Sequence, residues 1–430
     1  MTAGRHASGL ERSAAQPRIG IFGNLGSGNI GNDASMEAVL RYFRSDHPGA
    51  VLDAMCGGAT VVSARYGIPA IPLYWYQKHD KRVSGLRPIL LKVLGKGLDV
   101  FRTAVWVRRH DVVIVPGMGV LEASLPLRPW GFPYAMFLLC MFGRLFGTKV
   151  ALVSVGAGAI RQRLTRRLLD WAARLAFYRS YRNPESRDAM RQRGLDTTRD
   201  PVYPDLAFYL RPPPLDAGDP RIVCVGVMAY YGSNDDRRNA GEIYSSYVAA
   251  MKAVVRWLVD SGRQVRLIVG DTNGSDNKVV EEILADLRES RPDLDRSSVI
   301  PQPVTCFADV MRAIQPAGSV VAIRFHNVLG ALRLCKPTIA ISYSAKHDAL
   351  MTDMGLPGFC RPVRTLDVEH LIEQFTELLA RSGQIQQTLA ELNVRNERLL
   401  EDQFTALSAA LFPAGRAARR PAAYRPAASG

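Results

Sequence analysis

Short apolar runs alternate with segments of helical periodicity along the first half of the chain. The runs that predict strands cover residues 18–23, 50–55, 111–116, 149–155 and 177–181, with a further strand-like stretch near 202–208. Between them, apolar residues recur at helical spacing, as Met36, Val39 and Phe43 do after the first run. Strands that are apolar on both faces are typical of parallel sheets covered by helices. This half is predicted to form a Rossmann-like α/β domain.

The same alternation returns in the second half of the chain. Strands are predicted at 221–227, 264–269, 298–300, 319–323 and 337–341. Helical segments separate these runs, and residues 367–411 have helical periodicity throughout. The second half is therefore predicted to form another Rossmann-like domain.

The clearest break between the two halves is the segment RPPP at 211–214. We place the linker there and expect domains at 18–212 and 213–384, facing each other across a cleft. In folds of this kind, ligands bind beyond the carboxyl ends of the strands. Disordered tails are expected at 1–17 and 413–430.

The charge of the chain narrows the choice of partners. The 430 residues carry a net charge of +15, with 47% hydrophobic and 22% charged residues, which is a globular composition. Arginines cluster at 161–167 and 187–193, where they form either solvated helix faces or a patch that faces a membrane or an acceptor. No zinc-finger spacing, P-loop or RNA-binding aromatic motif accompanies them, so nucleic acid is not the expected partner.

Cysteines and apolar segments indicate the compartment. The six cysteines form no CxxC pair and are expected to be buried free thiols in a reducing compartment. Residues 1–17 are polar and lack the apolar core of a secretory signal. The apolar segment 134–146 is too short to span a membrane and is either a buried helix or one that touches a membrane. A cytoplasmic protein is expected, and peripheral contact with the inner face of the cytoplasmic membrane stays open.

The first predicted strand runs into a loop rich in glycine and asparagine. Its positions of interest are Asn24, Gly26, Gly28, Asn29, Gly31 and Asn32. The loop fits G-x-G-x-x-G, and Asp53 stands where a dinucleotide-binding fold places its ribose ligand. However, the loop is too long for the direct strand-to-helix turn of that fingerprint. We favour a loop whose backbone amides, beside a helix N-terminus, bind an anion, with a plain connecting turn as the alternative.

Other candidate residues of the first half also follow predicted strands. Gly117, Gly119 and Gly156 permit close approach of a ligand or a neighbouring loop to the backbone, or serve simple tight turns. Arg182 and Asp205 stand near two further strand ends, where each contacts substrate or forms a structural pair. Three glycine loops in one half favour a shared cleft over three unrelated turns.

The strongest candidate site lies in the second half. Arg324 and His326 follow the apolar run 319–323, at the start of a predicted helix. An arginine at a buried strand end needs a partner, and its guanidinium suits a carboxylate or phosphate. His326 adds a proton-transfer group, and Lys346 follows the next strand, where it meets the same anion or lies on the surface. The pattern predicts an anion site that also donates a proton, with structural hydrogen bonding as the alternative.

Taken in order, these segments resemble the polysaccharide pyruvyl transferase family. The matching segments lie at 24–34, 116–119, 154–156, 181–186, 203–205, 324–326, 343–346 and 354–356. No single motif is specific, but the ordered set spans roughly residues 18–360. Arg-x-His followed by Tyr-x-x-Lys is its strongest part.

The resemblance implies a GT-B-like fold and a particular reaction. Such an enzyme moves a pyruvyl group from phosphoenolpyruvate onto hydroxyls of a saccharide, forming a ketal and releasing phosphate. Phosphoenolpyruvate is a co-substrate, and neither a cofactor nor a metal is expected. In the GT-B fold a last helix, here 385–412, crosses back to the N-terminal domain. The acceptor would be a bacterial exopolysaccharide, cell-wall or glycolipid precursor, free or lipid-linked.

The resemblance also assigns roles to the candidate residues. Arg324, His326, Lys346 and Arg182 are expected to bind the donor, and His326 to protonate its methylene carbon. The Asn/Gly loop, the glycines after the later strands and Asp205 are expected on the acceptor side. A base is needed for the acceptor hydroxyls, and Asp33 is the candidate.

Two other functions stay open at this point. A GT-B glycosyltransferase that uses a sugar nucleotide would share the fold, because a fold alone does not determine a function. A non-catalytic, membrane-associated protein of polysaccharide assembly would account for the positive charge and the apolar segment 134–146.

Overall fold

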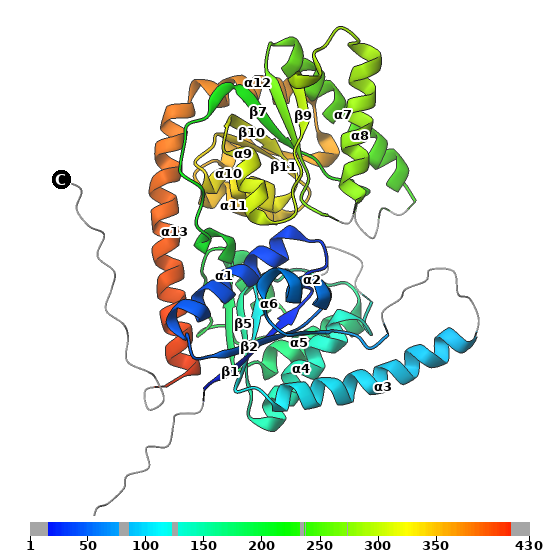
Figure 1. The fold of residues 1–430 in the computed structure, drawn as a ribbon, viewed down its shortest axis with the longest axis vertical. Coiled ribbons are helices and arrows are strands. Elements are labelled where there is room, and N and C mark those ends of the chain that lie inside the picture. Colours follow the sequence, from blue (N-terminus) through cyan, green and yellow to red (C-terminus); the bar gives the residue numbers. More distant parts are fainter. Residues whose placement is uncertain are drawn as a thin grey trace, which may run out of the picture.

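Two α/β lobes, each built on a parallel sheet, lie one above the other in the computed structural model (Figure 1). The structure describes residues 16–76, 86–122, 128–232, 236, 238–272 and 274–413. In the helix that begins at Leu86, side chains are described from residue 94 onward. The predicted tails therefore lie outside the described residues except at their inner ends.

The N-lobe contains a six-stranded parallel sheet in the order β3-β2-β1-β4-β5-β6. Its strands are β1 (Arg18–Gly23), β2 (Val51–Cys56), β3 (Ala70–Pro72), β4 (Val112–Pro116), β5 (Lys149–Val155) and β6 (Tyr178–Tyr181). Its helices are α1 (Ile30–Asp46), α2 (Ala59–Tyr66), α3 (Leu86–Arg108), α4 (Phe132–Phe146), α5 (Arg163–Leu175) and α6 (Pro184–Gln192). Because all strands are parallel, their carboxyl ends share one edge.

The C-lobe repeats this arrangement with the order β12-β11-β10-β7-β8-β9. Its strands are β7 (Asp219–Gly226), β8 (Gln264–Ile268), β9 (Val299–Pro301), β10 (Ala317–Ala322), β11 (Thr338–Ser342) and β12 (Cys360–Pro362). Its helices are α7 (Ala240–Asp260), α8 (Ser275–Ser290), α9 (Phe307–Ile314), α10 (Phe325–Arg333), α11 (Ala345–Asp353) and α12 (Val368–Ala380). The predicted Rossmann-like fold of both halves is confirmed.

One predicted strand is wrong. The stretch 202–208 forms only a single bridge, between Val202 and Tyr181, and then a 3₁₀ helix, η1 (Leu206–Tyr209). Pro204 cannot donate to a strand ladder. The Asp205 side chain accepts a hydrogen bond from the Ala207 amide at 3.0 Å and caps the short helix instead. The local capping chemistry therefore overrides the apolar pattern.

The apolar segment 134–146 is a buried helix. It forms most of α4, which packs between α3 and α5 and buries most of its side chains. Within the described ranges, no helix combines the length and the apolar character that crossing a bilayer demands. The six cysteines are free, as the sequence predicts; Cys56, Cys140 and Cys224 are buried, whereas Cys306, Cys335 and Cys360 are only half-buried.

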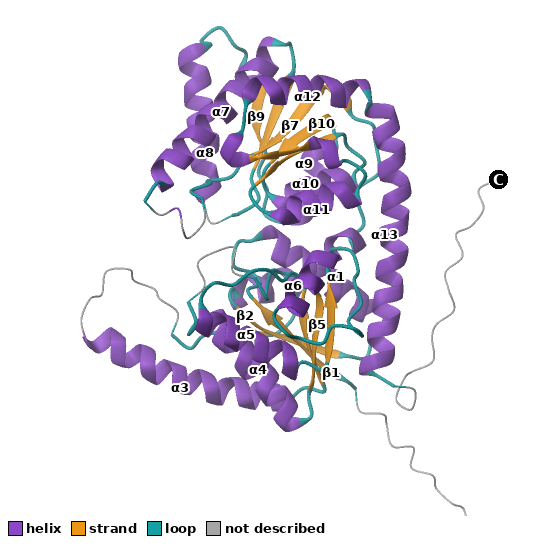
Figure 2. Ribbon diagram, turned by 180° about the vertical axis from the view of Figure 1, so that it is seen from behind, coloured by secondary structure: helices purple, strands orange, loops and turns teal. Residues whose placement is uncertain are grey.

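The long helix α13 (Ser382–Leu411) runs along both lobes (Figure 2). In the C-lobe, the Asn393 amide donates a hydrogen bond of 2.9 Å to the Leu332 carbonyl. In the N-lobe, the fully buried Gln403 accepts from Ser154 at 2.9 Å and donates to Ser180 at 3.0 Å. Side-chain amides on one helix therefore fasten the two lobes together.

We predict that Gln403→Ala lowers the free energy of unfolding by about 1–3 kcal/mol, because it leaves the buried Ser154 hydroxyl without its acceptor and removes one of the hydrogen bonds of the Ser180 hydroxyl. Chemical denaturation followed by circular dichroism measures this. Gln387→Ala, on the exposed face of the same helix, is the control and should change stability by less than about 0.5 kcal/mol. An equal effect of the two substitutions would contradict a specific fastening role for Gln403.

Candidate active site between the lobes

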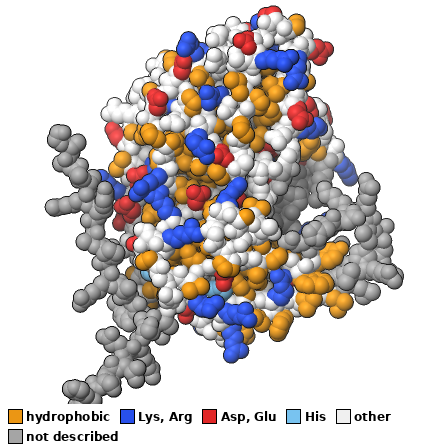
Figure 3. Space-filling model, viewed as in Figure 1, with side chains coloured by type: hydrophobic (Ala, Val, Ile, Leu, Met, Phe, Trp, Pro, Cys, Tyr) orange, Lys and Arg blue, Asp and Glu red, His pale blue; other side chains and the backbone are white. Residues whose placement is uncertain are grey.

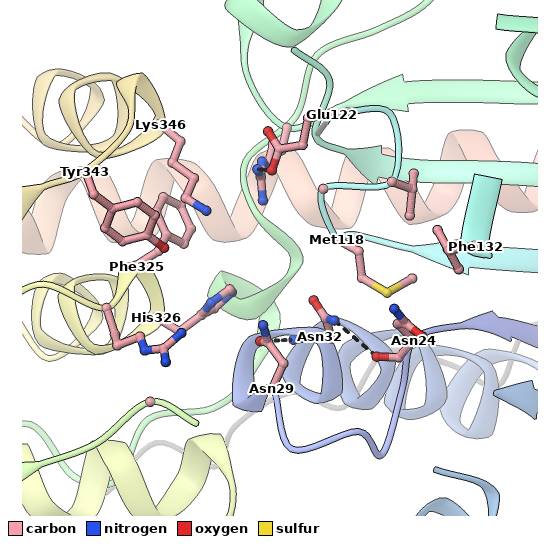
Figure 4. Close-up of a pocket in the computed structure, with 15 residues that line it drawn as sticks. Asn24, Asn29, Asn32, Met118, Glu122, Phe132, Phe325, His326, Tyr343 and Lys346 are labelled. Carbon is pink, nitrogen blue, oxygen red and sulfur yellow. Dashed lines mark hydrogen bonds and ion pairs between the residues drawn. The ribbon is translucent and has the colours of Figure 1, made fainter. Parts of the chain in front are cut away.

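A cavity of about 170 Å³ opens where the carboxyl edges of the two sheets face each other. From the N-lobe it is lined by Asn24, Asn29, Asn32, Met118, Gly119, Val120, Glu122, Phe132 and Arg182, and from the C-lobe by Gly270, Arg324, Phe325, His326, Tyr343 and Lys346. Figure 4 shows the asparagines and Glu122 on one side, opposite His326, Tyr343 and Lys346. Both lobes therefore supply the polar groups of one site.

Arg182 is a nearly buried cation of the cavity wall. It follows β6, and 7% of its side chain is exposed. Its Nη2 lies 3.4 Å from Glu122 Oε1, and its Nη1 lies 3.9 Å from Asp205 Oδ2. A Cβ atom at Gly156 would overlap this guanidinium, so that glycine is required for the close approach. The structure thus brings Gly156, Arg182 and Asp205 together, as the shared-cleft hypothesis expects.

His326 rests on the backbone of the opposite lobe. A Cβ atom at Gly31 would overlap its ring, so only glycine fits at the start of α1. Its Nε2 lies 3.9 Å from Asp205 Oδ1, beyond hydrogen-bond distance. Burial lowers the pKa of His326 to about 4. The Asp205 carboxylate opposes this shift, whereas the charges of Arg182 and Lys346 add to it. At neutral pH the imidazole is therefore uncharged.

Three buried polar atoms beside the cavity have no hydrogen-bond partner among the described residues. They are Nε of Arg182, Oδ2 of Asp205 and Nε2 of His326. Buried polar groups are normally satisfied, and clusters of exceptions are found at functional sites. A polar ligand is the kind of molecule that would supply the partners.

Arg324 has a carboxylate partner within the protein. Its Nε and Nη2 bind the two carboxylate oxygens of Asp276 at 2.8 and 2.7 Å. Burial alone would lower the pKa of Arg324, but its hydrogen bonds and ion pair with Asp276 raise it. Arg324 lines the cavity as predicted, but two of its three nitrogens are held by Asp276. Its charge is therefore largely offset, and the expected unpaired anion site is not observed at this residue.

Among the cations that line the cavity, Lys346 is the one whose charge is least offset by carboxylates of the protein. Its Nζ lies 5.2 Å from the centroid of the Tyr343 ring and 5.6 Å from that of Phe325. Within the described part of the chain it forms no ion pair. The alternative of a remote surface lysine is therefore excluded, and the positive charge points into the cavity (Figure 4).

Amides at the start of α1 are bound within the Asn/Gly loop itself. Asn29 caps α1, and its Oδ1 accepts from the amides of Gly31 and Asn32 at 3.1 and 3.3 Å. The loop also touches the C-lobe, because the Thr272 amide donates to the Gly28 carbonyl at 3.0 Å. The amides of Gly31 and Asn32 are therefore bound by Asn29 and do not contribute to the predicted cradle for an anion. What the loop contributes to the cavity is the polar side chains of its asparagines.

Asp33, the predicted base, does not line the cavity. It is buried, and its Oδ1 accepts from the Gly26 amide at 2.6 Å. Burial raises its pKa, and the Gly26 amide opposes that shift. Gly26 has a left-handed φ of 65°, so the carboxylate stabilises the loop conformation. The structure assigns Asp33 to the loop and not to the reacting groups.

The dinucleotide alternative also fails on geometry. Asp53, the expected ribose ligand, accepts hydrogen bonds from Trp106 Nε1 at 2.8 Å and from His110 Nε2 at 2.9 Å. Its carboxylate therefore joins β2 to the C-terminal end of α3. Such contacts give Asp53 a structural role.

The turn after β4 holds the backbone in an unusual conformation. Gly117 and Met118 both have left-handed φ angles, of 50° and 52°. This conformation is costly for methionine, and such strain is concentrated at functional sites. A Cβ atom at Gly119 would overlap the Glu122 carboxylate. The turn therefore places Met118 and Glu122 in the cavity wall.

Several functional candidates were not predicted from the sequence. Glu122 lies in a stretch without regular pattern, Phe132 looks like one more apolar residue of the helix α4, and Asp276 looks like an ordinary residue in the first turn of a helix. The need for an Arg324 partner was visible, but its identity was not, because Asp276 lies 48 positions away. In the described ranges, no group of three His, Cys, Asp or Glu side chains is arranged to hold a metal ion.

Comparison with known proteins gives a consistent result. The family model described as polysaccharide pyruvyl transferase matches residues 29–345. UDP-GlcNAc 2-epimerase from Neisseria meningitidis, solved with UDP-GlcNAc, is 10% identical with a TM-score of 0.56, and the match covers 92% of this chain and 99% of that one. The lipopolysaccharide outer core galactosyltransferase WaaB is 13% identical with a TM-score of 0.53, at 92% and 99% coverage.

A third similar structure is the N-terminal domain of trehalose-6-phosphate phosphatase from Candida albicans. It is 10% identical with a TM-score of 0.56, and the match covers 94% of this chain and 98% of that one. At such low identity these structures identify the fold only. The predicted GT-B-like architecture is thereby confirmed.

The depressed pKa of His326 predicts a pH dependence of stability. Between about pH 6.5 and 4, the unfolded chain binds a proton at this residue that the folded chain does not. The contribution of His326 to the free energy of unfolding is therefore complete above pH 6.5. It is lost as the pH is lowered, by up to about 1.4 kcal/mol per pH unit. We expect His326→Gln to reduce that slope in denaturation series at pH 7 to 5. The exposed His370→Gln should leave the slope unchanged, and equal slopes in wild type and His326→Gln would contradict the assignment.

Proposed function

The chain belongs to the polysaccharide pyruvyl transferase family, and we propose that it transfers the pyruvyl group of phosphoenolpyruvate to two hydroxyls of a saccharide, forming a ketal and releasing phosphate. The observation that carries this proposal is the cavity between the lobes, where Arg182 and Lys346 face His326. Phosphoenolpyruvate carries a carboxylate and a phosphate, and its anionic groups match the excess of positive charge there.

Donor binding is proposed to rest on Lys346 and Arg182. Lys346 has no carboxylate partner in the described chain, and the buried Nε of Arg182 has no acceptor. Arg324, held by Asp276, is proposed chiefly to position the start of α10, which carries His326. Bound phosphoenolpyruvate would accept a hydrogen bond from Nε of Arg182 and would offset the positive charges of Arg182 and Lys346.

The proposed chemistry balances as follows. His326 protonates C3 of phosphoenolpyruvate, and positive charge develops at C2. One saccharide hydroxyl attacks C2, the C2–O bond to phosphate breaks, and a second hydroxyl of the same saccharide closes the ketal. Of the two hydroxyl protons, one restores the proton that His326 gave to C3, and the other is carried away by the released phosphate.

His326 must gain a proton before it can act as this acid. In the protein without donor, burial and the charges of Arg182 and Lys346 hold its pKa near 4. A bound carboxylate and phosphate would counter those two charges and raise the pKa. Asp205, 3.9 Å away, favours the imidazolium further. Protonation of the acid is then coupled to the arrival of the donor.

The acceptor is proposed to bind on the N-lobe side. Asn24, Asn29 and Asn32 present amide groups there, and Phe132 adds an apolar ring. Glu122 is the one carboxylate among the described residues that line the cavity, so we propose it, in place of Asp33, as the base for the hydroxyls. The proposed acceptor is a polysaccharide of the bacterial cell envelope or its precursor.

We expect purified protein to release phosphate from phosphoenolpyruvate in the presence of its saccharide acceptor. Lys346→Gln and Arg182→Gln should each raise KM for phosphoenolpyruvate about tenfold or more, because each removes a charged donor from the anion. Lys278→Gln, at an exposed lysine of α8, is the control and should match the wild type. Unchanged KM in both cavity variants would contradict the assigned donor site.

A thermal-shift comparison separates this function from that of a sugar-nucleotide glycosyltransferase. Phosphoenolpyruvate should raise the melting temperature of the wild type, and UDP- or GDP-sugars should not. The reverse result would favour the glycosyltransferase. Phosphate release that is unaffected by His326→Ala with Lys346→Ala would place the chemistry elsewhere.

We also propose that the enzyme contacts an anionic membrane through the N-lobe. Large apolar side chains are exposed on and around α3: Leu94, Leu98 and Phe101 (68% exposed) lie on the helix, and Trp75 and Trp130 (59% exposed) lie outside it. Figure 3 shows apolar side chains gathered over α3. Exposed patches of this kind mark interaction surfaces.

The charged side chains on α3, α4 and α5 support an anionic surface as the partner. Exposed arginines on α3, α4 and α5 are Arg108, Arg144, Arg163, Arg166, Arg167 and Arg174. The carboxylates of these helices, among residues with described side chains, are Asp99 and Asp170, which are buried and paired with basic side chains. Apolar insertion and positive charge together are typical of peripheral membrane binding. A lipid-linked acceptor would then be presented at the same surface.

Sedimentation with lipid vesicles tests this membrane contact. We expect binding to vesicles that contain anionic phosphatidylglycerol and weaker binding to neutral phosphatidylcholine vesicles. Phe101→Ser with Trp130→Ser should reduce binding at least about fivefold, because these side chains insert into the interface. Leu215→Ser, at an exposed apolar residue of the linker, is the control. Equal binding of all variants, or no binding to anionic vesicles, would contradict the proposal.

A further inference from the structure

A second, wider hollow between the lobes lies beside α1 and has a volume of about 680 Å³. Its walls come from α1, the end of α2, the linker after η1 and the start of α9. Four arginines line it, Arg41, Arg44, Arg65 and Arg211, together with a single carboxylate, Glu37. Figure 3 shows basic side chains gathered between the lobes on this face. We call this hollow the arginine groove.

The four arginines are not neutralised within the described chain. None of them forms an ion pair, whereas the buried Arg179, Arg193 and Arg324 are each paired with an aspartate. Arg44 and Arg65 donate to backbone carbonyls, those of Tyr66 and Thr305.

Arg41 lies over the Tyr209 ring at 5.6 Å and likewise has no ion pair in the described chain. Burial, with repulsion from Arg211 and Arg333, lowers the pKa of Arg41. An anionic ligand would relieve this repulsion. The groove therefore has the charge of a ligand site and lacks the internal pairing of a structural one.

The groove is separate from the proposed active site but within reach of it. Glu37, Arg41 and Arg44 recur at helical spacing on one face of α1, whereas Asn29 and Asn32 at its N-terminus line the first cavity. From Asn32 to Arg41 the helix rises by about 14 Å. Asn32 and Arg41 face opposite sides of α1, so a saccharide chain that occupied both places would pass around this helix.

The proposed reaction indicates which anion belongs in the groove. Each pyruvyl ketal leaves one carboxylate on the saccharide, so a chain that has been modified once is anionic beside its next acceptor unit. Arginine is suited to bidentate binding of carboxylates. We propose that the arginine groove binds carboxylates of an acidic saccharide chain, in particular repeat units that already carry pyruvate ketals. This inference rests on the proposed pyruvyl transfer and adds a product-binding subsite that favours successive transfers along one chain.

Direct binding tests the groove without requiring catalysis. A labelled galacturonic acid oligomer is titrated with the full-length protein, and fluorescence anisotropy is compared with that of a neutral glucose oligomer of equal length. We expect the uronate to bind at least tenfold more tightly at low salt and to weaken as salt is added. Arg41→Gln with Arg211→Gln should lower the uronate affinity by about tenfold or more. Arg44→Gln is a second, independent variant with the same expected direction.

The control is Arg288→Gln with Arg398→Gln, which removes two exposed arginines from other surfaces and should not change the uronate affinity. Melting temperatures show whether each variant is folded. Equal affinity for uronate and neutral oligomer, equal losses in groove and control variants, or tighter arginine-dependent binding of a short RNA would each overturn the inference. Phosphate release by the wild type with a small soluble acceptor is measured in parallel. Absence of phosphate release would count against the proposed pyruvyl transfer, whereas the binding titrations alone test the arginine groove.

Discussion

The contact between the His326 ring and the backbone at Gly31 sets the geometry of the whole site. It places the start of α10 in the C-lobe directly on the start of α1 in the N-lobe, with no room for a side chain between them. Asp205 and Arg182 lie behind this contact, and Lys346 beside it. The cavity is therefore a property of the interface, because the N-lobe supplies the asparagines and Arg182, whereas His326 and Lys346 come from the C-lobe.

The helix α13 keeps that interface in register. Asn393 is bound to the end of α10, and Gln403 to β5 and β6, so α13 holds the two elements that lead to His326 and Arg182. These amides are buried, and breaking them exposes unsatisfied groups on both partners. The lobes are therefore connected twice, by the linker after η1 and by the helix α13.

The sequence predicted the fold better than the site. Continuous apolar runs identify buried parallel strands well, but the three-residue strands β3 and β12 are too short to form a pattern. Arg324, His326, Lys346 and Arg182 were predicted because charged residues after apolar runs are conspicuous. Their partners were not, since pairing such as Arg324 with Asp276 is a long-range property. Asp33 and the amides at the start of α1 were misjudged for a different reason, because their hydrogen bonds are made to near neighbours in the chain.

The placement of α13 has a consequence for biosynthesis. Phe404 stacks on Tyr42 at 4.4 Å, and Leu407 and Leu411 complete the apolar interior of the lobe that emerges first from the ribosome. That lobe cannot finish folding until residues from the last part of the chain arrive. During translation its unfinished surface must wait while the entire second lobe is made, which makes chaperone protection of the nascent chain a foreseeable requirement.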